Sequence, residues 1–196
     1  MGQMKHVRIT LSKILSQAWY TYKSIGFDLE ISPGNWESQK REVLDRGNGA
    51  TILLLNKKKK TIILTRQFRI PTYLNGNSTG YLIEACAGSI EENESPEANI
   101  IREVEEETGF YIKNAQKIFE AYMSPGAVTE IIHFFVAEID DSQKISSGGG
   151  NPSEHEFIEV LELIFSEAVD MISRGEIRDA KTIMLIQYAQ IHHLMG

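Results

Sequence analysis

Short runs of apolar residues alternate with polar turns along most of the chain. Runs of this length, bounded by glycine, proline, asparagine or lysine, are typical of β-strands. The strands predicted on this ground cover residues 27–31, 36–44, 51–55, 61–65, 81–87, 115–122, 131–139 and 157–163. The apolar period lengthens to that of a helix over residues 95–108, 166–173 and 179–193. This order of elements predicts an α/β fold, in which helices cover both faces of a mixed sheet.

The first 45 residues have a pattern of their own. Residues 27–31 and 36–44 flank a Pro33-Gly34-Asn35 turn, which predicts a small antiparallel β-sheet unit. This stretch contains few apolar residues, so it must pack on the rest of the chain or on a partner subunit. The polar residues from position 46 onward mark a boundary, which predicts one unit over residues 1–45 and a domain over residues 46–196.

The predicted helix at 95–108 carries clear start and stop signals. Ser95 is a good N-cap, Pro96 suits the first helical position, and Gly109 is placed to end the helix as a C′ glycine. The residues at helical spacing that we expect to face the core are Ala98, Ile101, Val104 and Thr108. Towards its end the helix is strongly acidic, and this is where candidate chemistry lies.

Glu103, Glu106 and Glu107 are spaced i, i+3 and i+4, so they share one face of this helix. Like charges at this spacing repel, and a bound divalent cation would remove the repulsion. Hard cations such as Mg²⁺ favour carboxylate oxygens and keep waters that substrate phosphates can replace. Arg102 lies four residues before Glu106 and can pair with it. A solvated acidic helix is the alternative, but it does not account for the fixed spacing of the neighbouring residues.

That spacing begins before the helix. It reads Gly88, five residues, Glu94, seven residues, and then Arg102-Glu103-Val104, Glu106-Glu107 and Gly109-Phe110. Every specified position resembles the signature of the Nudix hydrolase family. The resemblance implies a Nudix α/β/α sandwich with a mixed sheet and divalent-metal hydrolysis of a nucleoside diphosphate linked to another group. By this resemblance Glu103 and Glu107 bind metal, with Glu106 as a further ligand and the main-chain carbonyl of Ala87 joining them.

Other segments narrow the resemblance within the family. Glu84 and the Arg66–Arg69 segment are similar to the ADP-ribose and nucleotide-sugar branch, where an arginine such as Arg69 can bind a diphosphate through paired hydrogen bonds. The segments that resemble the bacterial GDP-mannose pyrophosphatase subgroup are residues 45–50, 123–130, 148–150, 160–163 and 175–182. This similarity runs from about residue 10 to the end of the chain.

The subgroup resemblance also implies a set of substrate contacts. They are Trp19, Lys40, Arg41, Glu42, Arg69, Ala87, Gly88, Ser89, Glu107, Glu130, Glu156 and Lys181. It implies a homodimer that shares its N-terminal sheets, with Trp19 reaching the partner's site to stack on a base. In the loop before position 157, Glu156 matches the carboxylate that meets metal and the attacking water, with Glu107 beside it. Glu154 is the alternative, and His155 between them is a candidate base or an exposed loop residue.

Charge and composition limit the classes of partner. The net charge is −7, which argues against a general nucleic-acid binder, since such proteins carry a basic face. Hydrophobic residues make up 42% of the chain, but no run approaches the ~20 residues of a membrane span, and no signal-peptide core is present. Cys86 is the one cysteine, which fits a reducing compartment. We therefore expect a cytoplasmic protein with no membrane partner.

The function expected from these observations is hydrolysis of the diphosphate bond of a nucleotide sugar. For GDP-mannose the products are GMP and mannose 1-phosphate, with Mg²⁺, or alternatively Mn²⁺, as the cofactor. One alternative is an ADP-ribose pyrophosphatase that releases AMP and ribose 5-phosphate. A second is a non-catalytic Nudix module that binds a nucleotide. Guanine and adenine differ by a few hydrogen bonds, which leaves the base preference open.

Overall fold

The computed structural model describes residues 6–196, except for the side chain of Glu154. The chain forms two compact units, which are described separately. The first contains residues 6–48 together with Tyr122–Ile131. The second contains Gly49–Ala121 and Ile132–Gly196.

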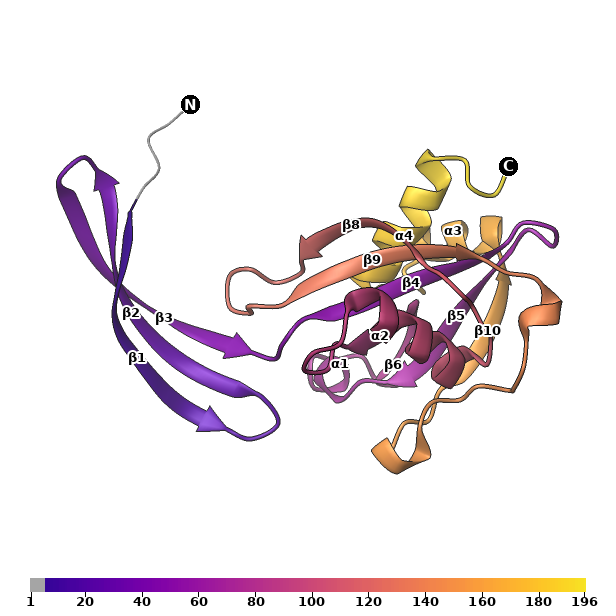
Figure 1. The fold of residues 1–196 in the computed structure, drawn as a ribbon, viewed down its shortest axis with the longest axis horizontal. Helices are drawn as coiled ribbons and strands as arrows, with labels where there is room; N and C mark the ends of the chain where they lie inside the picture. The colour runs from indigo at the N-terminus through magenta and orange to yellow at the C-terminus, as the bar shows by residue number, and fades with distance from the viewer. Residues whose placement is uncertain (1–5) are drawn as a thin grey trace. The chain divides into compact units, whose positions relative to one another are not determined.

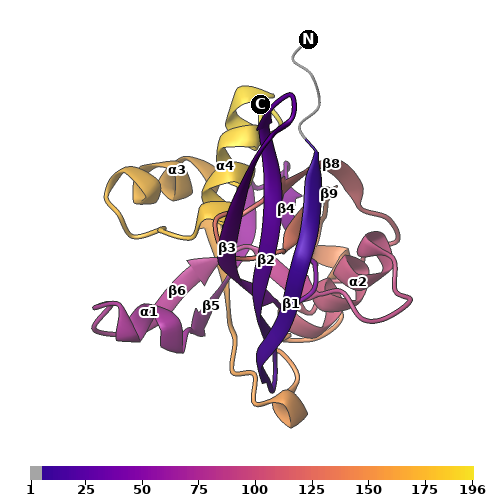
Figure 2. The same cartoon turned by 90° about the vertical axis from the view of Figure 1, so that its left-hand side faces the viewer.

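The first unit is built on a three-stranded antiparallel sheet in the order β1-β2-β3, drawn in indigo and violet in Figures 1 and 2. Its strands are β1 (Val7–Gln17), β2 (Thr21–Ser32) and β3 (Asn35–Asp45). The predicted turn and both predicted strands are confirmed, although β2 begins earlier than expected. We did not predict β1, although Val7, Ile9 and Leu11 alternate with polar residues over its first half; its pairing with β2 has two register irregularities, after Ile9 and after Ile14.

The segment Tyr122–Ile131 packs beside β3 in this unit. Leu44 N–H donates to the carbonyl of Ala127 at 2.8 Å, and Thr129 N–H donates to the carbonyl of Leu44 at 3.1 Å. The Thr129 hydroxyl donates to Asp45. These bonds attach a segment from the middle of the chain to the N-terminal sheet.

The second unit contains a mixed sheet in the order β10-β5-β4-β9-β8, with β6 paired to β5 and β7 paired to β4. The pairing of β4 with β9 is parallel, and the pairs β10-β5, β4-β5, β4-β7 and β5-β6 are antiparallel. The strands are β4 (Gly49–Asn56), β5 (Thr61–Phe68), β6 (Tyr81–Glu84), β7 (Cys86–Ser89), β8 (Gln116–Tyr122), β9 (Ile131–Glu138) and β10 (Glu159–Ile164). All residues of β4 are buried, because the sheet is covered on both faces.

Helices form the outer layers. They are α1 (Ile70–Leu74), α2 (Pro96–Glu103), α3 (Phe165–Ser173) and α4 (Ala180–Ile191), with short 3₁₀ turns at Asp141–Gln143 and Pro152–Glu154. Within the second unit, α2 covers one face of the sheet, and α3 and α4 cover the other (Figures 1 and 2). Ile52, Leu54, Ile100 and Val104 belong to the core beneath α2. The predicted α/β sandwich with an added antiparallel sheet is confirmed.

Three details differ from the predictions. The strand expected at 81–87 is two strands, β6 and β7, separated by Ala85. The end of the acidic helix, Val104–Thr108, widens into a π-helical turn, and Ala98 is exposed while Ile100 is buried. On α4, Leu185, Ile186 and Ala189 are buried, whereas Ile191 is 70% exposed. None of the described helices is long and apolar enough to cross a membrane.

Candidate active site

The acidic helix begins and ends at the predicted residues. Ser95 Oγ accepts a hydrogen bond from Ala98 N–H at 3.1 Å, which satisfies one free donor of the first turn. Pro96 occupies the first helical position. Gly109 ends the helix with a φ of +72°, in the left-handed region that favours glycine. These ends set the position of the glutamates between them.

Arg102 binds the glutamates that surround it. Its guanidinium lies 3.0 Å from the carboxylates of both Glu103 and Glu106, and it also bonds Glu94. The predicted pairing with Glu106 is confirmed. About 38% of the Glu106 side chain is exposed, so it lies nearer to solvent than Glu103. Arg102 therefore orients the outer carboxylates of the helix.

Glu103 and Glu107 are buried although they are acidic. Burial raises the pKa of Glu103 to about 7, and the charges of Glu106 and Glu156 add to the rise. Burial raises the pKa of Glu107 to about 8, with further contributions from Glu103 and Glu156. Arg102 lowers the pKa of Glu103 and Arg69 lowers that of Glu107, but burial and the neighbouring carboxylates outweigh these cations. This donor set suits a hard divalent cation.

The backbone beside these carboxylates is shaped to receive them. A Cβ on Gly88 would lie 2.1 Å from Glu103 Oε1, so only glycine lets this side chain lie against the strand. Ala87 N–H donates to Glu107 Oε2 at 3.3 Å. Among the described residues, no group of three acidic, histidine or cysteine side chains is arranged closely enough to enclose an ion. Since Glu103 is turned to Arg102 and Glu107 to Ala87 N–H, chelation would require their carboxylates to rotate.

The loop that carries Glu156 is attached to the end of the acidic helix. Gly149 N–H donates to the carbonyl of Glu107 at 2.9 Å, and Gly150 N–H donates to the carbonyl of Glu106 at 3.1 Å. These bonds satisfy helix-end carbonyls that would otherwise lack partners. Glu156 Oε2 accepts from Asn151 N–H at 3.2 Å. The loop thus brings Glu156 close enough to Glu103 and Glu107 to act on their pKa values.

A buried charged cluster lies at the carboxyl end of β6. Glu84 accepts from Arg69 Nε at 2.7 Å and from Lys181 Nζ at 2.6 Å, and Lys181 also contacts Asp179 at 2.9 Å. Burial alone would raise the pKa of Glu84, but Lys181 and Arg69 hold it below its ordinary value. Burial disfavours the Lys181 ammonium, but Glu84 and Asp179 outweigh it and raise its pKa. Two of the predicted substrate contacts, Arg69 and Lys181, are therefore brought together as charged groups.

The remaining predicted contacts lie mostly in the first unit. Trp19, in the turn between β1 and β2, is 87% exposed. Glu42 on β3 accepts a hydrogen bond from Tyr22, and Glu130 pairs with Arg46 at 3.3 Å. In the second unit, Ser89 is exposed at the end of β7. The side chain of Glu154 lies outside the part of the chain that the structure describes.

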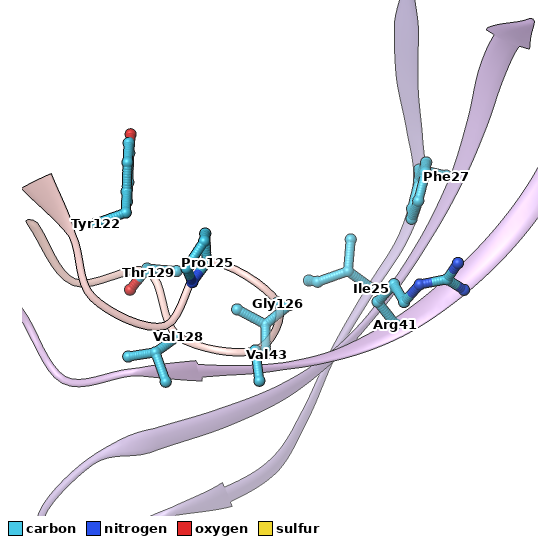
Figure 3. Close-up of a pocket in the computed structure, with 10 residues that line it drawn as sticks. Ile25, Phe27, Arg41, Val43, Tyr122, Pro125, Gly126, Val128 and Thr129 are labelled. Carbon is cyan, nitrogen blue, oxygen red and sulfur yellow. The ribbon is translucent and has the colours of Figure 1, made fainter.

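Arg41 lines a pocket of about 550 Å³ within the first unit (Figure 3). Ile25 and Phe27 of β2 form one part of its wall, and the segment that follows Tyr122 forms another. The Arg41 guanidinium is held by the carbonyl of Lys40 and by Gln39. The pocket thus combines apolar walls with the Arg41 guanidinium. The carboxylates proposed as metal ligands, Glu103, Glu107 and Glu156, belong to the second unit.

Comparison with known proteins identifies the family. The NUDIX domain model matches residues 45–185, and the model described as the GDP-mannose pyrophosphatase NudK N-terminal domain matches residues 6–44. This chain is a Nudix hydrolase. Members of the family generally depend on a divalent metal, which agrees with the paired, buried carboxylates of this Nudix hydrolase.

Relatives match this Nudix hydrolase over almost its whole length. GDP-mannose pyrophosphatases from Escherichia coli O1:K1 and from Escherichia coli strain K12 are each 53% identical, over 97% of this chain and 98% of theirs. A crystal structure of an ADP compounds hydrolase has a TM-score of 0.73 and covers 98% of both chains at 18% identity, which shows a shared fold.

Sequence reasoning missed several residues that position the site of this Nudix hydrolase. Asp179 and Thr182 hold the charged cluster and the break after β6. A signal was present, since Asp179 is the first residue of the predicted helix at 179–193 and is a good N-cap. The role of Gly149 and Gly150 as donors to the acidic helix had no sequence signal, because the bonds join segments more than 40 residues apart.

Proposed function

We propose that this Nudix hydrolase cleaves the diphosphate bond of GDP-mannose and releases GMP and mannose 1-phosphate. The observation that carries the proposal is the pair of buried carboxylates, Glu103 and Glu107, with the half-buried Glu156 beside them, in a chain 53% identical to GDP-mannose pyrophosphatases over nearly its full length. The protein has a net charge of −7 and the diphosphate is also negative, so cationic groups are needed to hold the substrate in the site. Arg69 and Lys181 would supply part of this positive charge.

Glu103 and Glu107, with the carbonyl of Ala87 and with Glu106 and Glu156, would hold the metal, for which we propose Mg²⁺ with Mn²⁺ as an alternative. When bound, a divalent metal stabilises charge on the phosphate oxygens and lowers the pKa of bound water. Glu156 would orient the attacking water and accept its proton, with Glu107 beside it. Glu154 is the alternative for this step.

The substrate would be held by groups that match its charge. Arg69 and Lys181 would bind the diphosphate, and the main chain at Ala87, Gly88 and Ser89 would contact the substrate beside them. The proposed contacts of the first unit are Trp19, Lys40, Arg41, Glu42 and Glu130. We propose that Trp19 reaches the site of a partner subunit and stacks on the base.

The proposed assembly is a homodimer that shares its N-terminal sheets. Every residue of β1 is exposed, including Val7, Ile9 and Leu11, and an edge strand of this kind needs a cover. We further propose that residues 1–45 form the dimerisation unit and residues 46–196 the hydrolase domain. The proposed location is the cytoplasm, where the buried thiol of Cys86 would stay reduced.

Product analysis tests the substrate. The purified protein is incubated with Mg²⁺ and GDP-mannose, ADP-ribose or ADP-glucose in turn, with EDTA controls, and the nucleotides are separated by ion exchange. We expect GMP to form fastest, and only with metal. Glu107→Gln should lose most of this turnover, while Glu105→Gln, an exposed glutamate in the same turn, should keep it.

Two results would change the proposal. Faster release of AMP from ADP-ribose would keep the site and replace the substrate, an alternative that the Arg69–Glu84 pair also suits. No release from any of the three by a metal-loaded protein would favour a nucleotide-binding module.

A further inference from the structure

The main chain from Glu84 to Ala87 passes from one strand neighbour to another. Glu84 ends β6, which pairs with β5, and Cys86 begins β7, which pairs with β4. Ala85 lies in neither strand and is 1% exposed. Buried main-chain groups at such a crossing need hydrogen-bond partners other than the main chain of a neighbouring strand.

Buried threonine hydroxyls supply these partners. Thr65 Oγ1 donates to the carbonyl of Glu84 at 3.2 Å. Thr51 Oγ1 donates to the carbonyl of Cys86 at 3.0 Å. Both threonines come from the strands that flank the crossing, so these two bonds stay within the sheet.

The third bond comes from α4, which lies far from Ala85 in the sequence. Ala85 N–H donates to Thr182 Oγ1 at 2.7 Å, across 97 residues of chain, and Thr182 is 0% exposed. Thr182 Oγ1 also lies 2.6 Å from Asp179 Oδ2. Since a carboxylate only accepts, Thr182 gives its one proton to Asp179 and keeps its lone pairs for Ala85. The bond to Asp179 thus orients the Thr182 hydroxyl so that its lone pairs face Ala85 N–H.

We propose that Thr182 is a positioning residue for the metal site. By holding Ala85 N–H it sets the course of the chain into Ala87, whose carbonyl is a proposed ligand and whose N–H bonds Glu107. Its neighbour Lys181 holds Glu84, so one turn of α4 fixes both sides of the crossing. The inference rests on the proposed metal role of Ala87, and residues that orient ligands in this way commonly change metal affinity by about 10- to 100-fold.

The test compares Thr182→Val, which keeps the shape and removes the hydroxyl, with Thr182→Ser, which keeps the hydroxyl. Ile186→Val is the matched control, because Ile186 lies four residues further along α4, is 0% exposed and has a hydrocarbon side chain that forms no hydrogen bond. Mn²⁺ binding to each resting protein is measured by calorimetry, alongside Tm and the kcat and KM of Mg²⁺-dependent turnover. Thr182→Ala replaces Thr182→Val if the valine variant does not fold.

We expect Thr182→Val to bind Mn²⁺ about 10-fold more weakly and to lose at least about 10-fold in kcat. Thr182→Ser should stay within about twofold of the wild type, and Ile186→Val should lower Tm and leave Mn²⁺ affinity unchanged. Wild-type Mn²⁺ affinity in a folded Thr182→Val protein overturns the inference. Because Mn²⁺ binding is measured without nucleotide, weakened binding in a protein that does not cleave GDP-mannose supports the inference and rejects only the proposed substrate.

Discussion

Glu107→Gln should make the metal-free protein more stable at pH 8 while it abolishes turnover. Glu107 is 3% exposed, and its pKa in the folded protein is about 8 against an ordinary 4.5. Between these values the folded carboxyl keeps a proton that the unfolded chain has released. The folded state therefore loses stability as pH rises through this window. At ~1.4 kcal/mol per pKa unit the full rise corresponds to about 5 kcal/mol, a large part of the stability of a typical domain.

Glutamine avoids this loss because it is neutral at every pH, and its amide oxygen can still accept from Ala87 N–H. The free energy of unfolding is measured by urea titration in EDTA at pH 5 and pH 8, for wild type, Glu107→Gln and the exposed control Glu105→Gln. From pH 5 to pH 8, Glu107→Gln should gain about 3 to 4 kcal/mol relative to wild type, and Glu105→Gln should not. An equal difference between Glu107→Gln and wild type at both pH values would refute the reasoning.

Three further changes probe separate parts of the site. Gly88→Ala places a methyl group in the space of Glu103, so kcat should fall at least about 10-fold with a lowered Tm, measured by steady-state assay and thermal melting. Lys181→Met leaves the buried Glu84 with one partner and should cost about 3 to 5 kcal/mol of stability by urea unfolding, whereas the exposed Lys58→Met should cost almost nothing. Trp19→Ala should leave Tm unchanged, because the side chain is 87% exposed, while KM rises about 10-fold; an unchanged KM would reject base stacking.

Local chemistry was predictable from the sequence. The N-cap at Ser95, the glycine end at Gly109 and the Arg102–Glu106 pair each depend on residues a few positions apart, and all three are confirmed. The family signature likewise predicted the sandwich, because it is read from one continuous stretch. The cap, the glycine end and the ion pair are reliable because the geometry of one helix brings their residues together.

Long-range contacts were not predictable in the same way. At the break between β6 and β7, Ala85 N–H bonds Thr182, 97 residues away, and the apolar run at 81–87 contains no sign of this bond. Ala98 was placed wrongly because the buried face of α2 runs through Asn99, Ile100 and Glu103, whereas Val104 and Thr108 in the π-helical turn are buried as predicted. In both cases the outcome depends on tertiary contacts, which a local pattern does not contain.

The parallel pairing of β4 with β9 joins Gly49 to Ile132, and the bond between Glu84 and Lys181 spans 97 residues. Contacts of such high contact order form slowly, because long loops must close before any of them gains stability. The charged cluster can therefore assemble only after α4 has been synthesised and docked. A nascent chain that has not yet extended through α4 would carry the complete acidic helix while Glu84 still lacks Lys181, so the proposed site would be finished only when the fold is.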